Sequence, residues 1–146
     1  MTIFLGADHR GFELKSQIKS WLLDNSFQVE DLGAEEFVDN DDFIEYAVSV
    51  GEKVASNPDT KGIVLCGSGA GVEISANKVK NIRCCLGQSR EQIAKARQAD
   101  DINVLAFASD FTDIEMAKDL IEVFLQTDFI RNENHVRRIE KIKSLE

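Results

Sequence analysis

The chain has 146 residues, of which 43% are hydrophobic and 29% charged, a balance typical of one folded domain over residues 1–146. Its 17 basic and 26 acidic side chains give a formal net charge of −9. This excess of acid argues against general binding to nucleic acid or to an anionic membrane surface, because either partner would be repelled over most of the protein. A local pocket of N–H groups and arginines can still bind a small anion.

The first residues are apolar only briefly and carry no basic leader, so we expect no secretory signal peptide. No apolar run approaches the ~20 residues that a membrane-spanning helix needs. The cysteines Cys66, Cys84 and Cys85 are odd in number and two are adjacent, which argues against a disulfide framework. No cysteine and histidine residues cluster at metal-ligand spacing. We therefore expect a cytoplasmic protein with neither metal nor cofactor.

Short β-branched runs alternate with segments of helical periodicity along the chain. In the first half the pattern predicts a strand at 2–7, a helix at 11–24, a strand at 27–32, an acidic loop at 35–42 and a helix from residue 43. In the second half it predicts a strand at 62–66, a short helix ending at 76, a strand at 82–86, a helix at 90–99, a strand at 103–108, and helices at 113–126 and 133–145.

This alternation predicts right-handed crossovers between parallel strands, and so an α/β fold. We expect a three-layer α/β/α sandwich around a five-stranded parallel, Rossmann-like sheet, followed by a C-terminal helix. Ligands bind such sheets beyond the carboxyl ends of the strands. That rule selects three segments: residues 7–10, residues 66–73, and the turn after the fifth strand.

The segment Cys66-Gly-Ser-Gly-Ala-Gly71 is the most informative of the three. Glycines at Gly67, Gly69 and Gly71 let the backbone turn sharply and bring N–H groups close to an anion. The same glycines also fit a tight strand-to-helix turn that binds nothing. The spacing differs from that of a nucleotide-binding Walker loop, and no dinucleotide fingerprint follows the first strand.

Cys66 stands where the third predicted strand meets this loop. A lone cysteine at a strand end is often a small buried apolar residue. Next to N–H groups and a helix N-terminus, however, a thiolate is favoured and can act as a nucleophile or a general base. Cys84 and Cys85 have no such surroundings, and we expect them to pack in the core.

Charged residues near the two ends of the chain offer further candidates. Asp8 and His9 follow the first strand directly, where they can serve as a helix cap and a solvated imidazole, or as a proton-transfer and anion-contact pair; we favour the second interpretation. Arg137 and Arg138 lie in a basic stretch of the last helix. They form either a solvated face or a clamp for phosphate, to which guanidinium binds well.

These segments occur together and in the same order in one known family. They are Asp8-His-Arg-Gly-Phe-Glu-Leu-Lys15, Asp31-Leu-Gly33, Cys66-Gly-Ser-Gly-Ala-Gly71, Ala76-Asn-Lys-Val79, Asn103-Val-Leu-Ala-Phe107 and the tail from His135 to Glu140. On these motifs, nearly the whole chain resembles the type B ribose-5-phosphate isomerases, whose relatives include galactose-6-phosphate isomerase subunits and allose-6-phosphate isomerase.

The resemblance implies an aldose–ketose isomerase that interconverts ribose 5-phosphate and ribulose 5-phosphate through a cis-enediolate, without a cofactor. Cys66 would be the base that moves the proton between C2 and C1. Removing a proton beside a carbonyl needs a base and donors for the developing oxyanion. The backbone N–H groups of Gly67–Gly71 and the Ser68 hydroxyl would be those donors, Asp8 would handle protons on the sugar oxygens, and His9 would help to hold the phosphate.

The resemblance also implies substrate contacts from His135 and Arg138, and a homodimer or higher homo-oligomer whose sites are built across the interface. Some relatives use a glutamate base near the glycine loop, but it aligns with Val72. One residue means a rotation of about 100° on a helix. We therefore expect Glu73 to be a solvated side chain or a partner of the helix dipole, and a candidate base only in reserve.

The chain departs from the family pattern at three positions. Ala99, Asp110 and Asn134 stand where the family commonly has histidine, arginine and arginine. The histidine assists ring opening in the family, and Asp100 could take that part here. Asp110 would repel a phosphate. Two alternatives therefore stay open: an isomerase of another sugar phosphate, such as allose or galactose 6-phosphate, or a catalytically silent subunit of a heteromeric isomerase.

Overall fold

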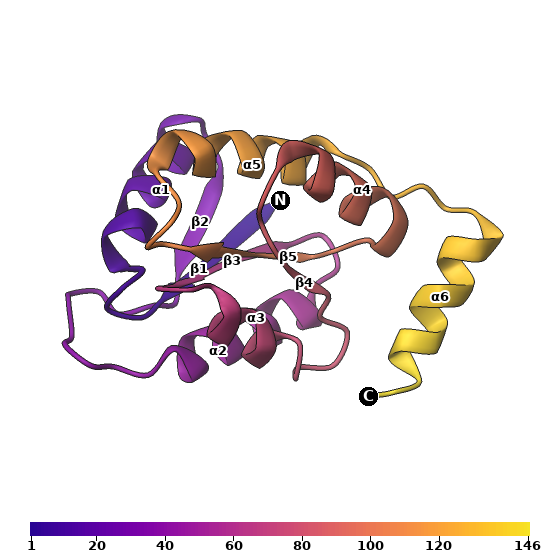
Figure 1. Ribbon diagram of the computed structural model, residues 1–146, viewed down its shortest axis with the longest axis horizontal. Coiled ribbons are helices and arrows are strands. Elements are labelled where there is room, and N and C mark those ends of the chain that lie inside the picture. Colours follow the sequence, from indigo (N-terminus) through magenta and orange to yellow (C-terminus); the bar gives the residue numbers. More distant parts are fainter.

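Strands and helices alternate along the chain, which ends in two successive helices, in a computed structural model that describes residues 1–146 (Figure 1). The strands are β1 (Thr2–Ala7), β2 (Gln28–Asp31), β3 (Lys61–Cys66), β4 (Cys84–Leu86) and β5 (Val104–Ala108). The helices are α1 (Phe12–Asp24), α2 (Phe43–Ser56), α3 (Ala70–Ala76), α4 (Arg90–Asp100), α5 (Ile114–Gln126) and α6 (Glu133–Lys143). The predicted α/β/α fold is confirmed, and the predicted boundaries lie within two residues of these.

The sheet has five parallel strands in the order β2-β1-β3-β5-β4. β3 lies in the middle, and its side chains are buried on both faces from Gly62 to Cys66. Ala7 of β1 pairs with Leu65, and Ala108 of β5 pairs with Cys66. The carboxyl ends of β1, β3 and β5 therefore meet at one edge, as the sequence predicts.

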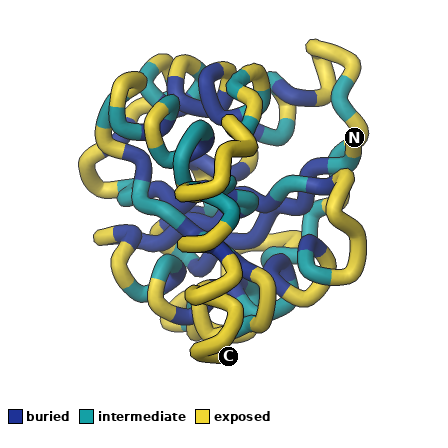
Figure 2. The backbone as a smooth tube through the Cα atoms, turned by 90° about the vertical axis from the view of Figure 1, so that its right-hand side faces the viewer, coloured by how far each residue is buried: buried dark blue, intermediate teal, exposed yellow.

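Two apolar cores fill the space between the sheet and its helices. α1, α4 and α5 cover one face, and α2 and α3 cover the other (Figure 1). Because side chains alternate along a strand, Ile63 and Leu65 lie in the first core while Val64 and Cys66 lie in the second. Buried residues accordingly run through the middle of the molecule and exposed residues cover its outside (Figure 2).

Helix α6 stands apart from the two helical layers, beyond the amino ends of β4 and β5 (Figure 1). Only Ile139 of this helix is buried. The Ile130 N–H donates to the carbonyl of Gln98 (3.0 Å), and the Asn81 N–H donates to the side chain of Glu146 (2.8 Å). These contacts hold the C-terminal segment at the end of the sheet opposite to Cys66.

A buried ion pair joins α1 to the end of β2. The side chain of Lys15 is 1% exposed, and its Nζ donates to Asp31 Oδ1 (2.7 Å) and to the carbonyl of Ala34 (2.9 Å). A Cβ at Gly33 would come within 2.8 Å of that Nζ and 2.9 Å of the amide nitrogen of Ala7. The Asp31-Leu-Gly33 motif thus provides the acid for Lys15 and the room for its ammonium group.

We expect Lys15→Met to lower the free energy of unfolding by about 3–5 kcal/mol, because it leaves the Asp31 carboxylate without its buried partner. Lys19→Met is a matched control, since Lys19 pairs with the same Asp31 (3.1 Å) but its side chain is 42% exposed. Its loss should cost about 1 kcal/mol or less. Urea unfolding at pH 7 measures both, and equal losses would contradict a special role for Lys15.

Candidate active site

The loops that follow β1, β3 and β5 come together over the carboxyl edge of the sheet. The Ser109 N–H donates to the carbonyl of Cys66 (2.9 Å), the Asp110 N–H donates to that of Gly67 (3.0 Å), and the Asp8 N–H donates to that of Leu65 (3.4 Å). These backbone bonds place Asp8, His9, Cys66 and Ser68 in one region, as the sequence predicts.

Cys66 is the last residue of β3, a free thiol that is only 4% exposed. The chain leaves the sheet immediately after it, so the next amides have no strand to pair with. The N–H groups of Gly67, Ser68 and Gly69 donate to no backbone carbonyl. The exposed Ser68 adds a hydroxyl to this row. Successive free N–H groups can hold an oxyanion beside the thiol.

Two of the loop glycines are required by packing. Gly69 has φ +76°, and a Cβ there would lie 3.0 Å from the amide nitrogen of Ala108. A Cβ at Gly71 would meet the ring of Phe43 at 2.6 Å. The tight turn predicted from the glycines is therefore present, and it leaves the N–H groups of Gly67–Gly69 without a backbone acceptor.

Asp8 is buried, with 5% exposure, at the start of the turn into α1. Its Oδ1 accepts hydrogen bonds from the N–H groups of Arg10 and Gly11, at 3.0 Å each. Burial raises the pKa of the Asp8 carboxyl, although these N–H groups act in the opposite direction. A raised pKa suits a group that takes up and returns protons near neutral pH. Asp8 is thus both the cap of the turn and a candidate acid–base.

His9 is held by a carboxylate that sequence analysis did not single out. Asp41 Oδ1, from the acidic loop at 35–42, accepts from the His9 N–H (2.7 Å) and lies 2.9 Å from its Nδ1. The hydrogen bond to Asp41 raises the pKa of His9. Burial acts to raise the pKa of Asp41, but the His9 hydrogen bonds outweigh it and the pKa is lowered. Nδ1 is engaged, so Nε2 is the nitrogen left to bind a ligand.

The second oxygen of Asp41 is buried without a hydrogen-bond partner. The Tyr46 hydroxyl faces the same carboxylate, and burial together with that charge raises the pKa of Tyr46. The acidic loop at 35–42 gives no sign in the sequence of which carboxylate turns inward. Only the position of the loop beside the β1 turn identifies Asp41.

Asp110, the acid that the sequence places near the expected anion, is paired. The Arg10 guanidinium donates to Asp110 Oδ2 (2.5 Å), and the Asp110 carboxylate raises the pKa of Arg10. A Cβ at Gly67 would overlap the Arg10 side chain. The pair therefore lies directly over the loop that follows Cys66.

Three of the predicted substrate contacts lie elsewhere in the chain. Asp100 ends α4, before β5, and His135 and Arg138 are in α6. From Gly62 to Cys66 the paired strands β3 and β5 span about 13 Å, so Asp100 lies at the opposite end of the sheet from Cys66. His135 is occupied locally by the carbonyl of Ile130 (2.8 Å). Within one chain the structure does not bring these three residues to the thiol.

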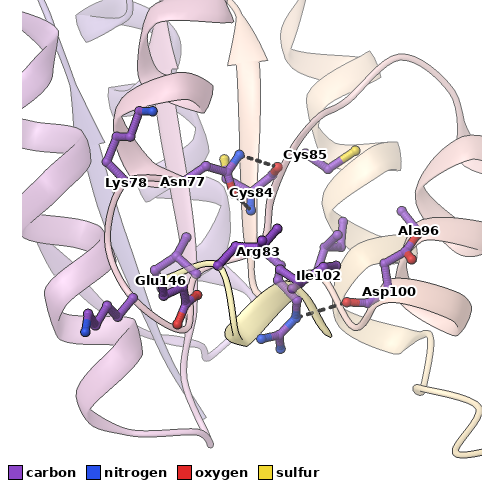
Figure 3. Close-up of a pocket in the computed structure, with 13 residues that line it drawn as sticks. Asn77, Lys78, Arg83, Cys84, Cys85, Ala96, Asp100, Ile102 and Glu146 are labelled. Atoms are coloured by element: carbon purple, nitrogen blue, oxygen red, sulfur yellow. Dashed lines mark hydrogen bonds between the residues drawn. The ribbon is translucent and has the colours of Figure 1, made fainter. Parts of the chain in front are cut away.

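A cavity of about 710 Å³ opens at that opposite end, between β4, α4 and α6 (Figure 3). Asn77, on its wall, donates to the Cys84 carbonyl (2.9 Å) and accepts from the Cys84 N–H (2.8 Å). Burial raises the pKa of Cys84 well above its ordinary value and that of Cys85 to about 11. Both remain thiols at neutral pH, and Cys84 packs in the core as expected while Cys85 is half-buried on the cavity wall.

Glu73 lies in the first turn of α3, as expected of a partner of the helix dipole, but it is not a solvated side chain. Its Oε1 accepts a hydrogen bond from the Leu86 N–H (2.9 Å) and so holds the end of β4, instead of lying free in solvent. No group of three or more histidine, cysteine or acidic side chains could hold a metal ion. No helix combines the length and apolarity needed to cross a membrane.

Comparison with known proteins gives one consistent result. The model of the Ribose/Galactose Isomerase family matches residues 3–142. A protein of Mycoplasma genitalium named probable ribose-5-phosphate isomerase B is 43% identical over 142 residues, covering 96% of this chain and 92% of that protein. The Mycolicibacterium paratuberculosis ribose-5-phosphate isomerase B is 34% identical over 146 residues, covering 100% and 92%.

Solved structures agree over the same length. The ribose-5-phosphate isomerase B of Mycoplasma genitalium with bound ribulose 5-phosphate superposes with a TM-score of 0.93 at 39% identity, covering 99% of this chain and 95% of that one. The match extends across nearly every element of the fold, including the strand-end loops and α6. The chain therefore belongs to the Ribose/Galactose Isomerase family.

Proposed function

We propose that this chain interconverts ribose 5-phosphate and ribulose 5-phosphate, with Cys66 as the base. The observation that carries the proposal is the junction of β3 and its loop, where a thiol adjoins a row of free N–H groups. A relative that shares the fold was solved with bound ribulose 5-phosphate, which supports a pentose phosphate as the ligand.

The reaction moves one proton and one pair of electrons along the open-chain sugar. The Cys66 thiolate removes the proton from C2 of the aldose, and the C–H electrons form a C1–C2 double bond while O1 becomes an oxyanion. The free N–H groups of Gly67–Gly69 and the Ser68 hydroxyl stabilise this cis-enediolate. Asp8 gives a proton to O1 and takes one from O2. The Cys66 thiol, whose proton can exchange with solvent at this stage, then delivers a proton to C1, which yields the ketose and regenerates the thiolate.

His9 suits the phosphate end of the substrate, since its Nε2 is free and Asp41 favours its charged form. His135 and Arg138 fit the same ligand only if they come from another copy, because in their own chain they lie beyond the opposite edge of the sheet. We therefore place the enzyme in a homodimer or higher homo-oligomer with sites across the interface. In a two-fold assembly, each copy would complete its partner's site.

The cysteines support a location in the cytoplasm. The proposed substrate assigns the enzyme to pentose phosphate metabolism. All three thiols are free. Unpaired cysteines are typical of a reducing compartment.

Purified protein should convert ribose 5-phosphate to ribulose 5-phosphate, and Cys66→Ala should lower kcat by about 10²–10⁴-fold because the base is lost. Cys85→Ala is the matched control and should keep full activity, since Cys85 lies at the other end of the sheet. Thermal unfolding checks that both variants fold.

The same assay on allose 6-phosphate and galactose 6-phosphate addresses the open alternatives. Turnover of a hexose phosphate alone would contradict the proposed substrate. A folded protein that turns over none of the three would instead be a silent subunit.

The pH dependence of KM tests the pairing of His9 with Asp41. The folded pKa of His9 is raised, so its positive charge persists above its ordinary pKa of about 6.5 and is lost as pH rises through the raised value. The free energy of unfolding that the His9–Asp41 pair contributes is fully present below about pH 6.5 and is lost as pH rises through the raised pKa of His9. In Asp41→Asn the pKa of His9 falls, so KM for ribose 5-phosphate should start to rise at a lower pH than in the wild type.

Initial rates between about pH 6 and 9 measure this shift. Asp39→Asn, an exposed acid of the same loop, controls for the general loss of negative charge. Identical KM profiles for Asp41→Asn and the wild type would contradict a role for His9 charge in binding.

Sites shared between copies can be tested by mixing two inactive variants. One variant, Cys66→Ala, lacks the thiol of its own site. The other, Arg138→Ala, lacks the guanidinium that each copy is proposed to contribute to the site of its partner. After random exchange, half of the dimers are mixed and each mixed dimer has one intact site, so about one quarter of wild-type activity should return. Mixed dimers that form without any recovery would show that Arg138 acts within its own chain.

A further inference from the structure

Arg10 and Asp110 face each other across the loop that carries Cys66. Their side chains come from the β1 and β5 turns, and Nη2 lies 2.5 Å from Oδ2. A Cβ at Gly67 would overlap the Arg10 side chain and would lie 3.0 Å from Asp110 Oδ2. The absence of a side chain at Gly67 is therefore what allows this ion pair to rest directly on the catalytic loop.

The charges around the loop leave one permanent cation in the chain's own half of the site. Asp8, Asp41 and Asp110 are acids, and together they would repel a phosphate dianion at close range. His9, paired with Asp41 at 2.9 Å, is positively charged only below its raised pKa. Arg10 is the cation that stays charged at every working pH.

The guanidinium of Arg10 has donors to spare. Of its three nitrogens only Nη2 has a partner, Asp110, which leaves the donors of Nε and Nη1 available. Its side chain is 56% exposed, so a ligand can reach it. A planar guanidinium can bind a carboxylate on one edge and a phosphate on another.

Both ends of the pair are anchored by backbone hydrogen bonds. The Arg10 N–H donates to Asp8 Oδ1 (3.0 Å), and the Asp110 N–H donates to the carbonyl of Gly67 (3.0 Å). The two turns are thus fixed relative to the loop, and the ion pair holds the guanidinium over it. A side chain that was free to rotate would lose more entropy on binding an anion.

We infer that Arg10 binds the substrate phosphate together with His9 in the chain's own half of the site, and that Asp110 is the residue that positions Arg10. This inference rests on the proposed function only for the nature of the ligand, a sugar phosphate. Asp110, which sequence analysis marks as an obstacle to phosphate, instead becomes the support of the group that attracts it.

Calorimetric binding of inorganic phosphate and of ribose 5-phosphate tests the role of Arg10 without relying on turnover. Arg10→Gln should weaken both ligands by about 10–100-fold, the loss expected for a charge-assisted hydrogen bond. Arg10→Lys should recover part of the loss because it restores the charge. Arg90→Gln removes a comparable exposed ion pair, which joins the start of α4 to Asp119 of α5, and should change neither affinity.

The exchange Arg10→Asp with Asp110→Arg tests the positioning. If the pair places a guanidinium over Gly67 from either turn, the exchanged chain should bind phosphate at least about tenfold more tightly than Arg10→Asp alone. An exchanged chain that folds but binds no better would overturn the role of Asp110. If the Arg10→Gln variant loses thermal stability but keeps the wild-type phosphate affinity, the ion pair only stabilises the fold. That result would overturn the role of Arg10 in binding phosphate.

The two proposals fail in different ways. If the wild type binds phosphate through Arg10 but does not isomerise ribose 5-phosphate, the proposed substrate is wrong and the inference stands. If it isomerises ribose 5-phosphate and Arg10→Gln leaves both affinities unchanged, the function stands and the inference is wrong.

Discussion

The site depends on the parallel register of β1, β3 and β5. Because Ala7 pairs with Leu65 and Cys66 with Ala108, three chain segments leave the sheet at one edge, each about 5 Å from the next. The pairing of β3 with β5 fixes the backbone of Cys66, while the N–H groups of the next residues have no strand to pair with. The base and its oxyanion donors are thus neighbours in the chain, at the point where β3 becomes a loop. Because the fold already orders these residues, bringing them together costs little further chain entropy.

Ion pairs between neighbouring elements hold this edge together in a chain with a net charge of −9. Lys15–Asp31 fixes the start of the acidic loop, His9–Asp41 fixes its end, and Arg10–Asp110 closes the β1 turn against the β5 turn. In each pair the carboxylate binds a cationic side chain from another element. At the site, Asp41 and Asp110 would repel an anion if they were unpaired, but they instead orient the groups that attract it. The negative net charge of the protein is therefore compatible with an anionic ligand.

Local sequence signals predicted the parts of the site that local chemistry determines. A β-branched run ending in Cys66 and three glycines specifies a strand, a turn and free amides, and Asp8 before a helix specifies a cap. Asp41 was missed because a run of acids has no periodicity, and the Arg10–Asp110 pair because its partners are 100 residues apart. Asp100, His135 and Arg138 could be named from the family pattern. Asp100 precedes the strand predicted at 103–108 and so already falls at the amino edge of a parallel sheet, whereas the order of elements does not say where the last helix, with His135 and Arg138, packs.

The central claim is that a thiol at this strand end moves a proton between carbon atoms. The most direct measurement is NMR of the product formed from ribose 5-phosphate in D₂O. The account predicts that solvent deuterium enters C1 of ribulose 5-phosphate at one of its two prochiral positions, and that Cys66→Ala stops this exchange. Deuterium that enters C1 at the wild-type rate in a folded Cys66→Ala variant would contradict an enediolate formed by Cys66.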